Sequence, residues 1–369
     1  MKIYLNTICK NEIDIIDEYI NKHINEPRIT GIYILDTGST DGTYEKLLEY
    51  TKKYPNKLFV NQKTYTKFYF DVARNDASAM LPKDDGWVLN VDIDEYVEWN
   101  DNDIEEITLE NILKKADELN CKKIFYLYLP DDTQPNFAFY AGKIVKNQTY
   151  KWINPVHELP DLLNKNDMIF KINRVLIKQK MRPNIHKTYK SYLEECLFTR
   201  PEYEMALFYL LKEYYNSREF HKCPPLIEKI KKSSLENNYK CCSLLIYHRI
   251  LALLNTPPTL LLQNLREALY FGHGRREVYV DLMYFYDSQN MLIDALWAGL
   301  SALRIKDRPF DFVDSPEFWN PELVEKKVYD ICQKIKNEKL LEIFMEDLKI
   351  SFETLNNKEN VNDRENINV

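Results

Sequence analysis

The sequence predicts an α/β domain built on a mixed, mostly parallel sheet, followed by an all-α domain of helical hairpins. Short apolar runs alternate with helical patterns through the first half of the chain. From about Ser191 the strand patterns stop and only helical patterns continue. The length of 369 residues also exceeds the size at which one hydrophobic core keeps growing, so two domains are expected.

Each element of the first half is predicted from its apolar periodicity. Strands that alternate with helices imply βαβ units and parallel pairing. The predicted strands are Lys2–Ile8, Gly31–Leu35, Leu58–Val60 and Trp87–Val91. The predicted helices are Glu12–Ile24, Tyr44–Tyr54 and Ile107–Leu119. Two further extended stretches, Lys123–Leu129 and Phe137–Val145, are expected to add to the sheet in antiparallel fashion.

Three helical pairs are predicted in the second half. They are Tyr203–Leu211 with Phe220–Ile230, Cys242–Leu254 with Leu260–Tyr270, and Val278–Tyr286 with Met291–Leu303. A repeat of roughly 34 residues favours tetratricopeptide-like hairpins, with an ordinary helical bundle as the alternative. We expect five side chains of these helices to be buried, namely Leu207, Leu210, Leu211, Tyr284 and Leu296.

Composition narrows the class of protein. A net charge of −7, with acids and bases mixed, argues against a nucleic-acid partner. The chain has no apolar run long enough for a transmembrane segment and no signal-peptide pattern. Seven cysteines without a C-x-x-C pair indicate reduced thiols. A cytoplasmic location is therefore expected. The Lys, Ile and Asn content suggests an AT-rich bacterial or large-DNA-virus genome, and for a viral chain the location would be the host cytoplasm.

A glycine-bearing loop follows the second predicted strand. Only 8 glycines occur in the chain, and two of them, Gly38 and Gly42, lie in the segment Asp36–Thr43. Ligands of open α/β sheets bind outside the carboxyl ends of strands, where such loops meet helix N-termini. The loop therefore indicates a binding site, although a well-capped loop without a ligand has the same composition.

A second cluster, Asp92-Ile93-Asp94-Glu95, follows the apolar strand predicted at Trp87–Val91. Acids that end a buried strand are costly unless they are paired or bound to a metal. Strand alternation would send Asp92 and Asp94 to the same side, so that both could hold one divalent cation. Surface turns produce the same D-x-D spacing, so the position after a buried strand carries the inference.

Five segments in this order resemble the family 2 glycosyltransferases of the GT-A fold. They are Thr7-Ile8-Cys9-Lys10-Asn11-Glu12, the loop Asp36–Thr43, Asp71-Val72-Ala73-Arg74-Asn75, Asp92-Ile93-Asp94-Glu95 and Trp152-Ile153-Asn154-Pro155-Val156-His157-Glu158. The resemblance covers roughly residues 1–160 and implies a GT-A, Rossmann-like mixed sheet of the nucleotide-diphospho-sugar transferase type. Pro155 departs from the glycine that relatives often have there, which puts the acceptor side in doubt.

The resemblance also implies roles for individual residues. Glu158 is the implied general base, with Glu95 as its rival. Asp94, Asp92 and His157 would hold Mn²⁺ or Mg²⁺. Asp36 would contact the base, and Arg74 would support the nucleotide pocket. The full set expected to bind the nucleotide sugar is Thr7, Cys9, Asn11, Glu12, Asp36, Gly38, Ser39, Asp41, Arg74, Asn75, Asp92 and Trp152.

The expected activity is that of an inverting hexosyltransferase (EC 2.4) that moves a sugar from a nucleoside-diphosphate sugar, with a UDP-sugar favoured. The acceptor would be a hydroxyl of a glycan, protein or other molecule. A sugar nucleotidyltransferase is disfavoured because Thr7–Glu12 contains no glycine. The remaining alternative is a helical-repeat scaffold with an inactive GT-A domain.

The expected domains are a glycosyltransferase domain at 1–185, a helical-hairpin domain at 186–350 and a disordered tail at 351–369. The helical domain could also join two copies of the chain into a homodimer.

Overall fold

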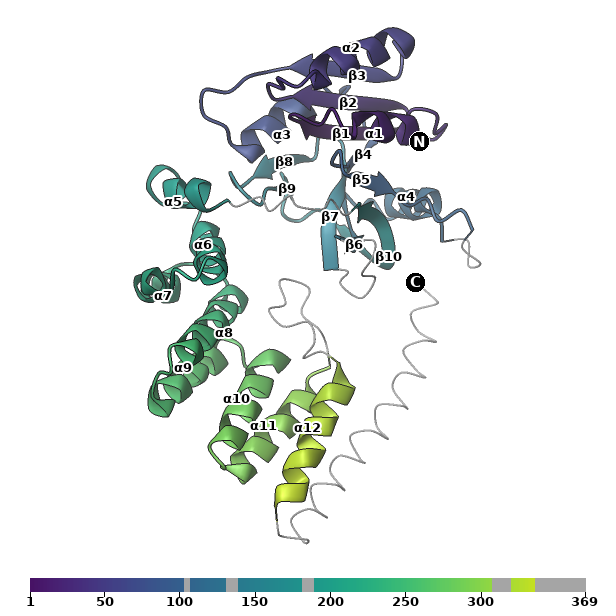
Figure 1. Cartoon of the computed structure of the whole chain (residues 1–369). Helices are drawn as coiled ribbons and strands as arrows, with labels where there is room; N and C mark the ends of the chain where they lie inside the picture. Colours follow the sequence, from purple (N-terminus) through teal and green to yellow (C-terminus); the bar gives the residue numbers. More distant parts are fainter. Residues whose placement is uncertain (103–106, 131–138, 181–188, 307–319, 336–369) are drawn as a thin grey trace. The chain divides into compact units, whose positions relative to one another are not determined.

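The computed structural model describes residues 1–102, 107–130, 139–180, 189–306 and 320–335. The chain divides into two compact units, Met1–Tyr192 and Leu193–Val369, called here the sheet unit and the helical unit (Figure 1). The boundary predicted at 185/186 and the predicted tail at 351–369 lie outside the described residues.

The sheet unit is built on an eight-stranded mixed sheet with the order β3-β2-β1-β4-β7-β6-β10-β5. Strands β1 to β4 pair in parallel, whereas β7 is antiparallel to both β4 and β6. A separate hairpin joins β8 to β9. The strands are β1 Ile3–Cys9, β2 Gly31–Asp36, β3 Leu58–Gln62, β4 Trp87–Asn90, β5 Glu95–Val97, β6 Lys123–Leu129, β7 Phe139–Lys146, β8 Tyr150–Ile153, β9 Leu159–Leu162 and β10 Ile169–Gln179.

Helices cover both faces of this sheet. The larger core joins α1 (Ile16–His23), α2 (Thr43–Lys53) and α4 (Leu109–Glu118) to one face through residues such as Ile20 and Leu113. On the opposite face a smaller core gathers Tyr4, Tyr33, Val88 and Val145. The helix α3 (Phe70–Ser78) packs against β1, β2 and β8. The mixed α/β sheet predicted from the sequence is therefore confirmed.

The topology fixes where a ligand can enter. Strand β1 lies between β2 and β4 and is parallel to both, so the carboxyl ends of all three strands share one edge. The chain leaves β1 toward β2 on one side and reaches β4 on the other, which makes this edge a topological switch point. Ligands of open α/β sheets bind at such points.

The helical unit contains consecutive helices that pack on their neighbours, such as α8 on α9 and α10 on α11. The helices are α5 Lys190–Thr199 (which begins in the sheet unit), α6 Met205–Asn216, α7 Cys223–Lys232, α8 Asn237–Leu253, α9 Pro258–Phe271, α10 Arg276–Ser288, α11 Leu292–Arg304 and α12 Pro321–Lys334, with a 3-10 turn at Phe220–Lys222. The predicted helical pairs are present. Their membership of the tetratricopeptide class stays a prediction.

Burial in the helical unit follows the expected stripe with one correction. Leu207, Leu210, Leu211 and Leu296 are buried as predicted, but Tyr284 is 39% exposed. In α10 the interior positions are taken by residues such as Met283, and Lys327 Nζ lies 5.1 Å from the Tyr284 ring centroid.

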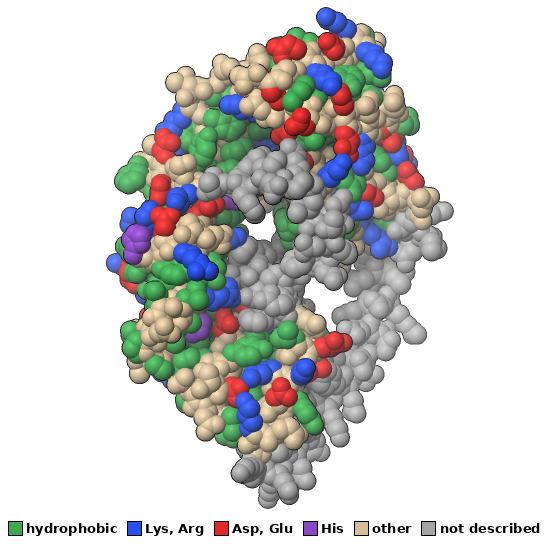
Figure 2. Space-filling view, in the orientation of Figure 1, with side chains coloured by type: hydrophobic (Ala, Val, Ile, Leu, Met, Phe, Trp, Pro, Cys, Tyr) green, Lys and Arg blue, Asp and Glu red, His purple; other side chains and the backbone are tan. Residues whose placement is uncertain are grey.

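Acidic and basic side chains are both numerous in the chain. On the face drawn in Figure 2, acidic and basic side chains are interspersed in both units. Among the described residues, no helix is long and apolar enough to cross a membrane.

Candidate active site

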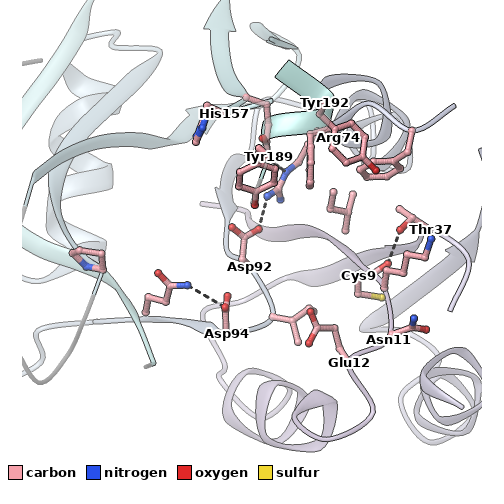
Figure 3. A pocket seen from close by; sticks show the side chains of 18 of the residues that line it. Cys9, Asn11, Glu12, Thr37, Arg74, Asp92, Asp94, His157, Tyr189 and Tyr192 are labelled. Carbon is pink, nitrogen blue, oxygen red and sulfur yellow. Dashed lines mark hydrogen bonds and ion pairs between the residues drawn. The ribbon is translucent and has the colours of Figure 1, made fainter. Parts of the chain in front are cut away.

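A cavity of about 800 Å³ opens where the turns after β1 and β4 meet the connection between β8 and β9 (Figure 3). The predicted site residues that line it are Cys9, Asn11, Glu12, Arg74, Asp92, Asp94, His157 and Glu158. The structure thus brings together side chains that are up to about 150 positions apart in the sequence, at the edge where the topology places a ligand.

The acidic cluster lies in a turn and not in a strand. Strand β4 ends at Asn90, before either aspartate. The amide of Glu95 donates to the Asp92 carbonyl at 2.9 Å, and Glu95 Oε2 accepts from the Asp92 amide at 2.9 Å. The expectation that strand alternation aligns Asp92 with Asp94 is therefore wrong. A doubly closed turn presents both side chains to the cavity instead.

Asp92 is held between two cations. Its Oδ1 accepts from Arg74 Nη2 at 2.5 Å, and its Oδ2 accepts from Lys143 Nζ at 2.9 Å. Burial alone would raise the pKa of Asp92, but the charges of Arg74 and Lys143 outweigh it, so the pKa of this carboxyl lies well below its usual range. Asp92 is therefore an ionised carboxylate with a fixed orientation.

Arg74 connects the acidic turn to the predicted base. Besides Asp92, its guanidinium reaches Glu158, with Nε donating to Oε1 at 3.1 Å. The guanidinium carbon lies 5.0 Å from the centroid of the Trp152 ring, and Arg74 is only 5% exposed. Helix α3, the turn after β4 and the segment after β8 are thereby tied together by one side chain.

The two candidate bases occupy different environments. Glu158 lines the cavity, whereas Glu95 does not and is 4% exposed. Glu95 Oε1 accepts from Lys143 Nζ at 2.6 Å and from the Tyr128 hydroxyl at 2.7 Å. Burial raises the pKa of the Glu95 carboxyl, which Lys143 partly offsets. Glu95 supports the turn through the Asp92 amide and does not line the cavity.

The predicted metal ligands do not form a closed cage. Asp94 lines the cavity, and its Oδ2 accepts from Gln179 Nε2 at 3.0 Å. His157, with a φ of 54°, lines the cavity too, and its ring meets Tyr189 edge-on at 5.4 Å. Over the ranges that the structure describes, no three His, Cys, Asp or Glu side chains form a group that could hold a metal. The set Asp92, Asp94 and His157 is therefore not preassembled, because Asp92 is already engaged by two cations.

Side chains of the loop Asp36–Thr43 form hydrogen bonds with residues of the same loop and of adjacent segments. Asp36 is fully buried; its Oδ1 accepts from the amides of Gly38 and Ser39, both at 2.9 Å, and from Gln62 Nε2 at 3.0 Å. Gly38 and Gly42 have φ values of 104° and 95°, which are left-handed conformations that favour glycine. Of this loop, only Thr37 lines the cavity, so the expected contact of Asp36 with a base is not supported by its position.

Hydrogen bonds also join this loop to the turn after β1. The Thr40 amide donates to Asn11 Oδ1 at 2.8 Å, and the Asn11 amide donates to Ser39 Oγ at 2.8 Å. Asp41 Oδ2 accepts from the Ile13 amide at 3.1 Å. Ser39 and Asp41 therefore shape the cavity edge by joining two loops, and they do not line it.

Three other residues that were predicted to bind the nucleotide sugar do not line the cavity. Thr7 is fully buried in β1. Asn75 Nδ2 donates to the Trp152 carbonyl at 2.9 Å, and Asn75 Oδ1 accepts from the Trp152 amide at 2.9 Å. Trp152 is 2% exposed and lies beneath Arg74, so it is not a stacking platform in the cavity.

Several cavity residues were not predicted. They are Ile8, Lys10, Thr37, Phe68, Phe70, Ile93, Pro130, Gln179, Lys180, Tyr189 and Tyr192. The unusually aromatic stretch Thr64–Phe70 was a usable signal for Phe68 and Phe70. Gln179 ends β10, and only the pairing of β10 with β5 brings it beside Asp94.

Comparisons with known proteins show similarity only to solved structures. No protein-family model matches the chain, and no curated protein matches it. Residues 1–349 of S. aureus TarS in complex with UDP-GlcNAc are 14% identical, with 85% of this chain and 95% of that chain covered and a TM-score of 0.38. The mannosyltransferase PcManGT from Pyrobaculum calidifontis, in complex with GDP-Man and Mn²⁺, is 13% identical, with 83% and 88% covered and a TM-score of 0.41.

Proposed function

We propose that the sheet unit is an inverting glycosyltransferase that transfers a sugar from a nucleoside-diphosphate sugar to an acceptor hydroxyl. The observation that carries this proposal is the cavity at the β1/β4 switch point, which Asp92, Asp94 and Glu158 line and where Arg74 pairs with Asp92 and Glu158. Carboxylates and a buried guanidinium at the carboxyl edge of an open sheet suit a ligand with hydroxyl groups and a diphosphate. A UDP-sugar is the donor that we favour.

The donor's nucleotide would lie along the ends of β1 and β2. The cavity is lined there by Cys9, Asn11, Glu12 and Thr37. The hydrogen bonds of Asn11 with Thr40 and Ser39 join the two loops at that edge and keep it rigid. Thr37, next to Asp36, is the residue of the loop Asp36–Thr43 that lines the cavity. A rigid edge of this kind reduces the ordering that ligand binding would otherwise require.

The residues also fit a divalent cation. Magnesium is usually bound by one or two carboxylates together with substrate phosphates, without a complete cage of protein ligands. Asp94, with His157 on the same cavity, matches that pattern, and Asp92 would contribute through its fixed charge. A bound cation would offset the negative charge that develops on the departing diphosphate.

Glu158 is the proposed general base. The acceptor oxygen forms a bond to the anomeric carbon while the bond from that carbon to the diphosphate breaks, which inverts the anomeric centre. The proton of the acceptor hydroxyl passes to Glu158, whose carboxylate is oriented by Arg74 Nε at 3.1 Å. Glu95 is too deeply buried for this role.

Release of nucleoside diphosphate from a panel of UDP- and GDP-sugars, with and without Mn²⁺, tests the proposal. Wild-type protein should hydrolyse at least one donor slowly, and Glu158→Gln should hydrolyse it more slowly still. A chain that neither binds nor hydrolyses any donor of the panel would favour the scaffold alternative.

A further inference from the structure

Lys143, on β7, is a largely enclosed cation whose position the proposed reaction does not yet explain. Its Nζ donates to Asp92 Oδ2 at 2.9 Å and to Glu95 Oε1 at 2.6 Å, and it lies 5.4 Å from the Tyr128 ring centroid. The lysine side chain is 23% exposed and the Glu95 side chain only 2%. Lys143 itself does not line the cavity.

The geometry fixes Asp92 from two directions. One oxygen of its carboxylate is held by Arg74 from α3, and the other is held by Lys143 from β7. A single cation would leave the carboxylate free to rotate about its last bond, whereas two cations on different oxygens define its plane. The remaining lone pairs of the two oxygens stay available to a ligand, because an ionised carboxylate can accept about four hydrogen bonds.

Glu95 completes the arrangement from behind. It accepts from Lys143 through Oε1 and from the Asp92 amide through Oε2. The same carboxylate therefore holds both the lysine side chain and the aspartate backbone in place. Tyr128 donates its hydroxyl to Glu95 at 2.7 Å and thereby holds it in place. Three acids and two bases alternate in the order Glu158, Arg74, Asp92, Lys143, Glu95.

We propose that Lys143 is a positioning residue of the donor site. Lys143 holds the Asp92 carboxylate in the orientation that binds the nucleoside-diphosphate sugar, and Glu95 is the counter-ion of Lys143. The inference rests on the proposed function. A buried ion pair is weak evidence for stability, since apolar replacements are often neutral, so the position of Lys143 needs another explanation. Control of a ligand-binding side chain is such an explanation.

The chain offers a matched control on the same strand. Lys146 is also a β7 lysine, is 8% exposed, is paired with Asp117 and lies 5.0 Å from the Trp87 ring centroid. Lys146 does not line the cavity, and its described side-chain contacts, with Asp117 and Trp87, lie outside the acidic turn. Lys146→Met therefore reproduces the loss of a buried β7 lysine without touching Asp92.

The test is calorimetric titration of the full chain with UDP and with GDP in the presence of Mn²⁺. Lys143→Met should raise the Kd of the nucleotide that wild type binds by roughly 10–100-fold, by analogy with outer-shell residues that orient metal-ligating side chains. Lys143→Arg should restore the Kd to within about threefold, and Lys146→Met should leave it unchanged. A Lys143→Met protein that binds as tightly as wild type overturns the proposal, whatever its melting temperature.

A double variant covers the case in which Lys143→Met does not fold. Lys143→Met with Glu95→Gln removes the lysine together with the acid that it neutralises. Nucleotide binding by this folded double variant that is weaker than that of Glu95→Gln alone supports positioning of Asp92 by Lys143. Wild-type affinity in the double variant would show that Lys143 only compensates Glu95 and would overturn the proposal. Absence of binding to wild type itself would instead refute the proposed function.

Discussion

Arg74 and Asp92 form an ion pair of 2.5 Å in which the arginine is 5% exposed and the aspartate side chain is 29% exposed. The arginine belongs to α3 and the aspartate to the turn after β4, so this pair couples the helix to the acidic cluster. The aspartate keeps its exposed part on the cavity, where both residues form part of the lining.

Loss of Arg74 should therefore damage both stability and ligand binding. In Arg74→Met, Glu158 loses its guanidinium partner while Asp92 retains Lys143, so we expect a loss at the lower end of the range for a broken buried pair, about 3 kcal/mol. Urea titration of the full chain measures this loss. Arg200→Met removes an arginine that is 32% exposed and should change the free energy of unfolding by less than about 0.5 kcal/mol.

Glu158 and Glu95 should respond differently to the same substitution. Glu158→Gln should keep donor binding and slow transfer by about 10²–10⁴-fold, since the proton acceptor is lost while the amide oxygen can still accept from Arg74 Nε. Glu95→Gln should mainly destabilise the turn, because Glu95 accepts from Lys143, Tyr128 and the Asp92 amide. Single-turnover rates at saturating donor distinguish the two. A dead Glu95→Gln enzyme beside a nearly unimpaired Glu158→Gln enzyme would reverse the assignment of the base.

His23 should make the protein less stable in acid. Burial lowers the pKa of His23 from 6.5 to about 4, and its Nε2 has no hydrogen-bond partner. Between these pH values the unfolded chain binds more protons than the folded chain, so stability falls as pH falls from 6.5 toward 4. The full effect is about 3 kcal/mol, of which about 2 kcal/mol should be lost by pH 5.

His23→Phe should remove this part of the pH dependence, because the ring is kept and the titrating group is lost. Urea titrations at pH 7.5 and pH 5 measure it, with exposed His221→Gln as the control that keeps the wild-type dependence. An equal loss of stability in His23→Phe and wild type would show that other groups cause the acid sensitivity.

Gly299 should be required for close packing of the helical unit. A Cβ atom at this position would lie 2.5 Å from Val328 Cγ2 and 2.8 Å from Met283 Sδ, on α12 and α10. Overpacking typically costs 1–3 kcal/mol, which exceeds the roughly 1 kcal/mol that glycine costs a helix relative to alanine. Gly299→Val should therefore lower the stability of the helical unit by about 2 kcal/mol in urea titration. Gly274→Val, with open space around the new side chain, should be nearly neutral.

The strands of the sheet unit could be predicted because they are buried apolar runs. Strands β1, β2 and β6 lie within one residue of their predicted bounds, and β7 is antiparallel as expected. Helix α3 was not predicted, because its buried positions include Asp71 and Arg74 and its buried apolar side chains are only the small Ala73 and Ala77. Strand β10 was missed because its first half alternates exposed and half-buried residues, and its pairing with β6 is set only by the fold.

The site was predictable where its residues lie in short segments that resemble glycosyltransferase motifs. The acidic turn, Arg74 and Glu158 were found, and they meet at one cavity. Their partner Lys143 was not found, since a lysine 51 positions after Asp92 carries no local signal. The loop motif did not reveal that the Asp36 carboxylate accepts the amides of Gly38 and Ser39 in its own loop.

In the proposed reaction, Asp94 and a divalent cation together bind the nucleoside diphosphate in this cavity. Calorimetric titration of UDP and GDP into wild type and Asp94→Asn, with and without Mn²⁺, tests it most directly, with equal melting temperatures showing that both proteins are folded. Wild type should bind one nucleotide in a Mn²⁺-dependent manner, and Asp94→Asn should lose that dependence, because a ligand carboxylate is removed from a hard-cation site. Equal Mn²⁺-dependent affinity of both proteins, or no binding to wild type, would show that Asp94 does not hold a cation for the donor.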